Sequence, residues 1–322
     1  MRKVTSYYKA DLATISSQRK NIKELQKAGL YPNQFDFPLL LQFELTRRCN
    51  VFCKHCYNNS GADNAEPDAM TPTKWKEFAK YVVSKGGIFE CVISGGEPLL
   101  LGDDLFDIMD ILHNDGTNFL LITNGYLLSH DKIEKLKKYR YKWIQISIDG
   151  CNAKYHDDFR QRDGCWERAV NGALMVSGAG LPLTIAHSVS PQNLKDIDEM
   201  CDLAYALGAG NIILGCISLS GRTFDNDYLL LNEEEKEFLI DRIEYNSKKY
   251  RGKMQITRSM EEPLQYERQK GLPCGGLIIR PNGDIRLDCM TPFVFGNVLK
   301  DDFSTVWKEK CTHCWDNEMV KE

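Results

Sequence analysis

The sequence has no long apolar run, no surplus of positive charge and no internal repeat. No stretch approaches the roughly 20 apolar residues that a membrane-spanning helix needs. The charged N-terminus has no apolar segment behind it, which excludes a secretory signal peptide. The 41 Lys and Arg residues face 45 Asp and Glu residues, so the basic surface that binds nucleic acid or anionic membranes is missing. We therefore expect a cytoplasmic protein that binds neither nucleic acid nor membranes.

Cysteine, in contrast, is abundant, with 12 in 322 residues. A reducing cytoplasm disfavours structural disulfides, so cysteines grouped along the sequence are expected to be metal ligands or catalysts. Five are scattered and are by default small buried hydrophobic residues, namely Cys91, Cys151, Cys165, Cys201 and Cys216. The remaining seven form two groups, which are Cys49, Cys53 and Cys56, and then Cys274, Cys289, Cys311 and Cys314.

Short apolar segments alternate with longer helix-type segments through the middle of the chain. The strand candidates are rich in Ile, Val, Leu and Phe, as parallel strands buried on both faces are, and comprise residues 39–45, 90–94, 118–123, 143–148, 183–189 and 211–217. Helix starts are indicated by Thr71-Pro72, by Ser190-Pro191 and by Asn232 before three glutamates. Repeated β-then-α units predict a parallel sheet with helices outside it, either open or curled into a partial barrel.

The composition divides the chain into three parts. Residues 1–38 form a polar N-terminal extension with a helix expected around residues 19–28. Residues 39–250 hold the alternating α/β segments. Glycine and proline then crowd residues 263–283, which predicts a small C-terminal domain over residues 251–322.

The first cysteine group lies in a loop directly after the first strand candidate. The carboxyl ends of parallel strands are where ligands and catalytic loops gather. The spacing of three and two intervening residues lets one loop surround a [4Fe–4S] cluster with three thiolates, which leaves one iron open. The alternative is a structural zinc site, which would need a fourth ligand, and His55 is too close to Cys53 and Cys56 to supply it comfortably.

This loop resembles the C-x₃-C-x₂-C signature of the radical S-adenosylmethionine (SAM) superfamily, and further motifs follow in the same order. Gly95-Gly96-Glu97-Pro98 resembles the segment that binds the methionyl amine of SAM. Asn124 ends the third strand, and Ser147 and Asp149 end the fourth, where relatives line the SAM pocket near ribose or methionyl groups. His55 stands where relatives often place an aromatic residue beside the adenine.

The resemblance implies a partial (β/α)6 barrel and a defined chemistry. SAM would bind the open iron, one electron would cleave its sulfonium bond, and the 5′-deoxyadenosyl radical would remove a substrate hydrogen. The electron donor would be of the flavodoxin or ferredoxin type.

The second cysteine group frames a predicted β-hairpin. Strands over residues 277–280 and 284–287 are joined by Pro281-Asn282-Gly283, which would bring Cys274 and Cys289 to the same end. With Cys311 and Cys314 they could hold an auxiliary [4Fe–4S] or [2Fe–2S] cluster, and a Cys₄ zinc ribbon fits the spacing nearly as well.

The order of these cysteines resembles the twitch form of the SPASM domain, which holds one auxiliary cluster; the later SPASM cysteines are missing because the chain ends at Glu322. Five residues separate Gly283 from Cys289, where relatives have four. Without an open iron, such a cluster would pass electrons to or from the substrate.

Cys216 is a candidate catalytic thiol. It lies in the sixth strand candidate, and a side chain directed into the barrel could donate a hydrogen atom to a substrate radical. The alternative is an apolar packed cysteine, and one residue of strand alternation decides between the two.

Three functions remain open. The first is modification of a ribosomally synthesised precursor peptide by cross-linking, thioether formation or epimerisation. The extension is too short for a fused leader-binding domain, so the peptide would bind directly or through a separate leader-binding protein. The second is oxidation or epimerisation of a small molecule such as an aminocyclitol. The third is a zinc-stabilised interaction protein without catalysis.

Overall fold

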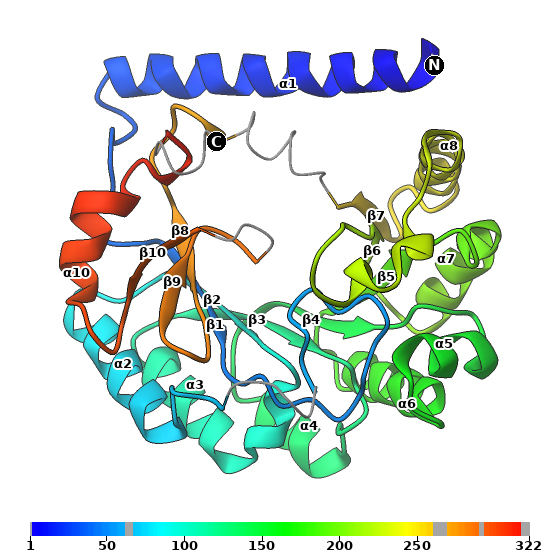
Figure 1. Cartoon of the computed structure of the whole chain (residues 1–322), viewed down its shortest axis with the longest axis horizontal. Helices are drawn as coiled ribbons and strands as arrows, with labels where there is room; N and C mark the ends of the chain where they lie inside the picture. Colours follow the sequence, from blue (N-terminus) through cyan, green and yellow to red (C-terminus); the bar gives the residue numbers. More distant parts are fainter. Residues whose placement is uncertain (1, 62–66, 260–268, 290–292, 317–322) are drawn as a thin grey trace.

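The computed structural model describes residues 2–61, 67–259, 269–289 and 293–316 (Figure 1). Its strands form one sheet in the order β10-β9-β8-β1-β2-β3-β4-β5-β6-β7. The strands from β8 through to β7 pair in parallel, whereas β9 and β10 are antiparallel. Their bounds are β1 Leu40–Glu44, β2 Glu90–Ser94, β3 Asn118–Thr123, β4 Tyr141–Ser147, β5 Leu183–Val189, β6 Asn211–Cys216, β7 Gln255–Arg258, β8 Gly276–Ile279, β9 Asp284–Arg286 and β10 Val294–Asn297.

Helices lie outside the curved sheet, which gives the predicted partial barrel (Figure 1). They are α2 Pro72–Ser84, α3 Asp103–Asn114, α4 His130–Leu136, α5 Ala153–Arg160, α6 Cys165–Gly178, α7 Ile197–Ala206 and α8 Glu233–Lys249. The extension forms α1 Arg2–Lys27, much longer than expected, and α10 Phe303–Val306 follows β10. No helix in the described ranges is long and apolar enough to span a membrane.

Strand alternation separates the core from the interior of the barrel. In β1, Leu41 and Phe43 are fully buried in the main hydrophobic core, and the ring of Phe43 lies 4.9 Å from that of Trp75 on α2. Gln42 and Glu44 alternate with them and therefore face the interior. The indole N–H of Trp75 donates to the Leu45 carbonyl at 3.0 Å, which fixes α2 where the strand ends.

Two of the three predicted helix starts are confirmed. Thr71 caps α2 through its side chain, and Asn232 forms a capping box with Glu235 at the start of α8. The prediction at Ser190-Pro191 is wrong, because α7 begins only at Ile197. The Asn193 side chain accepts the Ser190 N–H at 2.8 Å and closes a local turn in place of the first helical turn.

The C-terminal hairpin is confirmed as β8 and β9, and it joins the barrel sheet directly. β8 pairs in parallel with β1, and β7 pairs in parallel with β6, so strands after residue 250 extend the sheet at both sides. The division into domains at that residue stays a prediction.

A buried ion pair connects this hairpin to the barrel. Arg280, directly after β8, lies 2.9 Å from the Glu44 carboxylate, and both side chains are almost wholly buried. Burial raises the pKa of Glu44 even though Arg280 counteracts the shift. The Tyr57 hydroxyl donates to Glu44 at 2.8 Å, and Arg280 also donates to the Asn58 side chain. The hairpin is thereby tied to the residues that directly follow Cys56.

Replacing Arg280 by Met is expected to lower the free energy of unfolding by about 3–5 kcal/mol, because the Glu44 carboxylate stays buried without its cation. The double variant Glu44→Met/Arg280→Met removes both charges and should recover most of this loss. Urea unfolding of anaerobically purified protein measures the free energy of unfolding of both variants. A double variant no more stable than the single one would contradict the assignment to the ion pair.

Candidate functional site

A cavity of about 470 Å³ opens at the carboxyl ends of the parallel strands. It collects residues from the loop after β1 and from the ends of β2 to β6. The predicted site residues that border it are Cys49, Cys53, His55, Cys56, Gly95, Gly96, Asn124, Ser147, Cys216 and Cys289. Glu97, Pro98, Asp149, Cys274, Cys311 and Cys314 lie outside its lining. Residues up to about 240 positions apart in the sequence therefore meet at one place.

The three-cysteine loop is held on one side by the end of α5. The N–H groups of Phe52 and Lys54 donate to the carbonyls of Arg160 and Phe159 at 3.1 and 3.0 Å. The loop backbone on both sides of Cys53 is thus bound to the last carbonyl groups of helix α5. This pairing leaves the Cys53 side chain directed at the Arg160 guanidinium, whose Nη1 lies 3.4 Å from the sulfur.

Arg222 holds the same loop from the other side. Its Nε donates to the Cys53 carbonyl at 2.7 Å, its backbone N–H donates to the Cys56 carbonyl at 3.0 Å, and its guanidinium stacks over Phe52 at 3.9 Å. Arg160 and Arg222 are not among the residues that the sequence predicts at the site. Neither belongs to a spacing motif, and only the fold brings them to the loop.

The environment of Cys49 and Cys53 favours the neutral forms of these two thiols in the protein alone. Burial raises the pKa of Cys49 to about 12 and also raises the pKa of Cys53. A bound metal reverses this preference, because a coordinating thiol is deprotonated by the cation. The Asn124 side-chain amide lies 3.9 Å from the Cys49 sulfur, so polar hydrogens also face the thiols.

The donor set fits a [4Fe–4S] cluster with one open iron. Three thiols border a shared cavity, and such a cluster bound by three cysteines keeps one position for another ligand. The His55 Nδ1 and Ser60 Oγ atoms beside this cavity are buried without a hydrogen-bond partner in the described structure. A bound ligand could supply these partners. Within the described ranges, no group of three or more His, Cys, Asp or Glu side chains is arranged to hold a single metal ion.

The Gly95-Gly96-Glu97-Pro98 segment fits closely against the loop. The Gly96 N–H donates to Thr46 O at 2.7 Å and the Glu97 N–H donates to Arg48 O at 2.9 Å. Gly95 has a φ of +134°, and a Cβ on Gly96 would lie 2.1 Å from Arg48 O, so glycine is required at both positions. Their bare backbone forms one wall of the cavity.

Glu97 lies outside the cavity lining and holds the glycine segment in place. Its carboxylate is fully buried and accepts hydrogen bonds from Thr123 Oγ1 at 2.7 Å and from the Asn124 N–H at 2.8 Å. Burial raises its pKa although these donors counteract the shift. Glu97 therefore joins the end of β3 to the glycine segment and positions Asn124. Pro98 begins the buried 3₁₀ turn that follows, Pro98–Leu101.

His55 and Asp149 have well-defined partners. The imidazole of His55 stacks on Phe159 with centroids 4.5 Å apart, and burial lowers its pKa to about 3, so it is neutral. Asp149 is fully buried, and its carboxylate accepts from Arg160 and from the Ser188 N–H at 2.8 Å. The carboxylate that was expected near SAM is thus engaged by the protein.

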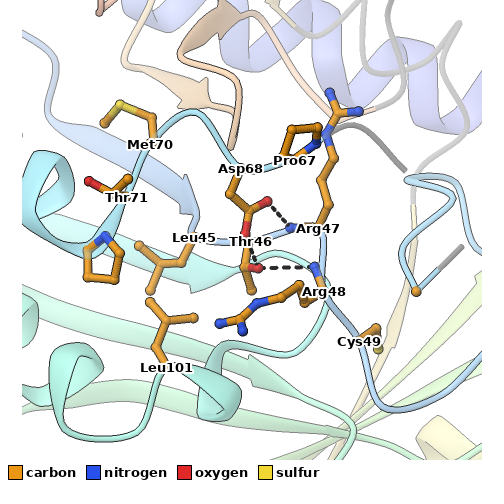
Figure 2. A pocket seen from close by; sticks show the side chains of 12 residues that line it. Leu45, Thr46, Arg47, Arg48, Cys49, Pro67, Asp68, Met70, Thr71 and Leu101 are labelled. Atoms are coloured by element: carbon orange, nitrogen blue, oxygen red, sulfur yellow. Dashed lines mark hydrogen bonds between the residues drawn. The ribbon is translucent and has the colours of Figure 1, made fainter. Parts of the chain in front are cut away.

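A second cavity of about 500 Å³ also borders Cys49 (Figure 2). It is bordered by the loop after β1 and by the segment that leads into α2. Asp68 accepts from the Arg47 N–H at 2.8 Å and from the Thr46 hydroxyl, and Thr46 in turn accepts from the Arg48 N–H at 3.0 Å. These bonds fix the backbone where the cysteine loop begins.

The C-terminal cysteines are not gathered at one point. Cys274 and Cys314 form a disulfide with Cα atoms 5.8 Å apart, and the Cys274 N–H donates to Thr312 O, which places Cys311 in the same buried region. Cys289 instead borders the main cavity. A sulfur in a disulfide cannot bind iron as a thiolate, so the disulfide and an auxiliary cluster exclude each other.

Cys216 ends β6 on the same face of the strand as Ile212 and Leu214, which belong to the hydrophobic core. It packs partly against that core and also borders the cavity at the strand end. The structure therefore places it at the boundary between the two environments that the sequence left open.

Several known proteins are similar to this chain. The protein AlbA of subtilosin biosynthesis, from Bacillus subtilis, is 27% identical over 87% of this chain and 62% of its own length. A PqqA peptide cyclase of Rhizobium meliloti is 27% identical over 84% of this chain and 74% of its length. An AdoMet-dependent heme synthase of Methanosarcina barkeri is 36% identical over 53% of this chain and 48% of its length. The chain thus spans less than two thirds of AlbA.

The fold and a family model agree with these similarities. Streptococcus suis SuiB bound to S-adenosylmethionine has a TM-score of 0.70 at 17% identity, over 92% of this chain and 71% of that chain, which shows a common fold. The model of the radical SAM superfamily matches residues 43–204, half of the chain, and this region contains the three-cysteine loop and the glycine segment. The chain therefore belongs to the radical SAM superfamily.

Proposed function

We propose that this chain is a radical SAM enzyme that modifies a ribosomally synthesised peptide. The observation that carries the proposal is the single cavity in which Cys49, Cys53 and Cys56 face Gly95, Gly96, Asn124 and Ser147. When bound, a [4Fe–4S] cluster and SAM supply a 5′-deoxyadenosyl radical for hydrogen abstraction. The relatives named as a peptide cyclase and as a subtilosin biosynthesis protein favour a peptide as substrate.

The chain's own residues would bind and orient SAM. The exposed backbone of Gly95 and Gly96 would hold its methionyl amine, while Asn124 and Ser147 face the cavity from the ends of β3 and β4. His55 is neutral and fixed by the Phe159 ring, so it can lie against the adenine without introducing a charge. Asp149 and Glu97 lie outside the cavity lining and would position the residues that contact SAM.

An auxiliary cluster forms part of the proposal. Cys274, Cys311 and Cys314 are buried near one another, and reduction of the Cys274–Cys314 disulfide would free the thiolates that iron requires. Cys289 would complete the set from the cavity side. The role of such a cluster would be electron transfer to or from the substrate. A flavodoxin- or ferredoxin-type donor would supply the first electron, and a separate protein could present the peptide leader.

A small-molecule substrate is the second candidate. The relative at 36% identity is named as a heme synthase, although it matches only about half of this chain. Dehydrogenation or epimerisation of a small molecule would use the same cavity and the same initial hydrogen abstraction.

Co-expression with each short open reading frame that flanks the gene tests the peptide substrate. Mass spectrometry should detect a peptide that has lost two hydrogens, and Cys49→Ala should abolish the change because the cluster loses a ligand. One added deuterium in heavy water would indicate epimerisation instead. No change in any neighbouring peptide, in cells that assemble the clusters, would exclude this substrate class and favour the small molecule.

Iron analysis separates the two predicted clusters. Anaerobically reconstituted protein should hold about eight irons if both clusters are [4Fe–4S], and Cys49→Ala/Cys53→Ala/Cys56→Ala should remove about four. Cys274→Ala/Cys314→Ala should remove only the auxiliary iron, and Cys91→Ala provides a control at a buried cysteine outside both groups. Full iron content in the Cys274→Ala/Cys314→Ala protein would contradict the auxiliary site.

Substitution of Cys216 by Ala tests its role as a hydrogen donor. If the enzyme is an epimerase, Cys216→Ala should lose deuterium incorporation while SAM cleavage to 5′-deoxyadenosine continues, because the thiol acts only after hydrogen abstraction. Chromatography of 5′-deoxyadenosine and mass spectrometry of the peptide measure the two steps separately. Retained epimerisation would assign Cys216 to packing alone, in agreement with its contact with the core.

A further inference from the structure

Arg160 occupies an unusual position for a charged residue. It ends α5, is only 7% exposed, and lies beside a sulfur that is predicted to bind iron. Its Nη1 is 3.4 Å from Cys53 Sγ. Its Nε and Nη2 lie 2.6 and 2.5 Å from the same carboxylate oxygen of Asp149. One guanidinium therefore contacts a sulfur on one side and a carboxylate on the other.

The surroundings hold this guanidinium in place. Asp149 accepts the Ser188 N–H at 2.8 Å with its other oxygen. Its own N–H donates to His156 Nδ1 at 3.0 Å, and its carbonyl accepts from the Asn193 side chain at 3.0 Å. Burial would raise the pKa of Asp149, but Arg160 holds it well below its ordinary value. The carboxylate is therefore ionised and cannot rotate without breaking several bonds.

The neighbouring titratable groups add little charge. Burial lowers the pKa of His156 to about 4, and it lowers the pKa of His187 as well, so both are neutral near pH 7. Arg222 reaches the same loop through the backbone carbonyls of Cys53 and Ser60. Arg160 is thus the charged group in contact with the Cys53 sulfur.

We propose that Arg160 raises the reduction potential of the cluster held by Cys49, Cys53 and Cys56, and that Asp149 positions it and moderates this effect. The inference rests on the proposed function, because it requires that cluster. A hydrogen bond to a ligating sulfur and a nearby positive charge both favour the reduced cluster, which carries one more negative charge. The buried Asp149 carboxylate opposes the charge of Arg160 but not its hydrogen bond.

The backbone pairing explains how the contact persists. Phe52 and Lys54 bind the carbonyls of Arg160 and Phe159, so Cys53 and Arg160 are held opposite each other by main-chain bonds. The guanidinium then needs no rearrangement when the cluster changes charge, which is the condition for a fixed electrostatic effect.

Two variants of the full chain, reconstituted anaerobically with iron and sulfide, test the proposal. They are expected to shift the midpoint potential of the cluster in opposite directions. Asp149→Asn leaves the Arg160 charge without its counter-ion and should raise the midpoint potential. Arg160→Met/Asp149→Asn removes the sulfur hydrogen bond without leaving a buried unpaired carboxylate, and should lower the potential below that of wild type. Electron paramagnetic resonance followed during a redox titration measures both, without any turnover.

Controls distinguish this inference from the proposed function. Arg222→Lys, which disturbs the clamp on the loop backbone but not the sulfur contact, should leave the midpoint close to that of wild type. Equal midpoints in wild type and both Asp149 variants, or a shift of the same sign in both, would overturn the role of Arg160 while leaving the cluster in place. A wild-type chain that binds no iron at the three-cysteine loop would overturn both proposals.

Discussion

The pairing of the cysteine loop with the end of α5 is the constraint on which the site depends. Thiols that are to bind a metal cannot by themselves hold their loop, because a site of this kind is completed only when the metal binds. The backbone on both sides of Cys53 is therefore bound by Arg160 and Phe159, and Arg222 binds the carbonyl of Cys53 itself. Main-chain bonds from other elements fix the loop and leave its sulfur atoms available.

The two arginines show how one residue type serves two purposes in a buried site. Arg222 spreads its donors over backbone carbonyls and the Phe52 ring, and so acts on the shape of the loop. Arg160 reaches the sulfur of Cys53 and is balanced by Asp149. A buried guanidinium needs such partners, because an unpaired charge in the interior is strongly unfavourable. The carboxylate that neutralises Arg160 belongs to Asp149, which the family resemblance predicts to lie near SAM.

The C-terminal hairpin brings the second set of cysteines into the same frame. β8 lies beside β1, and the Glu44–Arg280 pair with Tyr57 and Asn58 links it to the residues after Cys56. Because the hairpin is part of the barrel sheet, Cys289 can border the main cavity while Cys274 and Cys314 lie buried away from it. A substrate in that cavity would thus lie beside both the three-cysteine loop and Cys289.

The sequence by itself predicted most of the parallel strands and the three-cysteine loop. Continuous apolar segments reproduced the bounds of β2, β3 and β5, because strands buried on both faces leave little freedom in composition. Spacing alone singled out Cys49, Cys53 and Cys56 as candidate ligands, because local loop geometry sets their reach. Only the tertiary structure placed Arg160 and Arg222 at the loop, set Cys216 at the boundary between the core and the cavity, and separated Cys289 from Cys274. These features depend on contacts between distant segments, and no local pattern of residues encodes them.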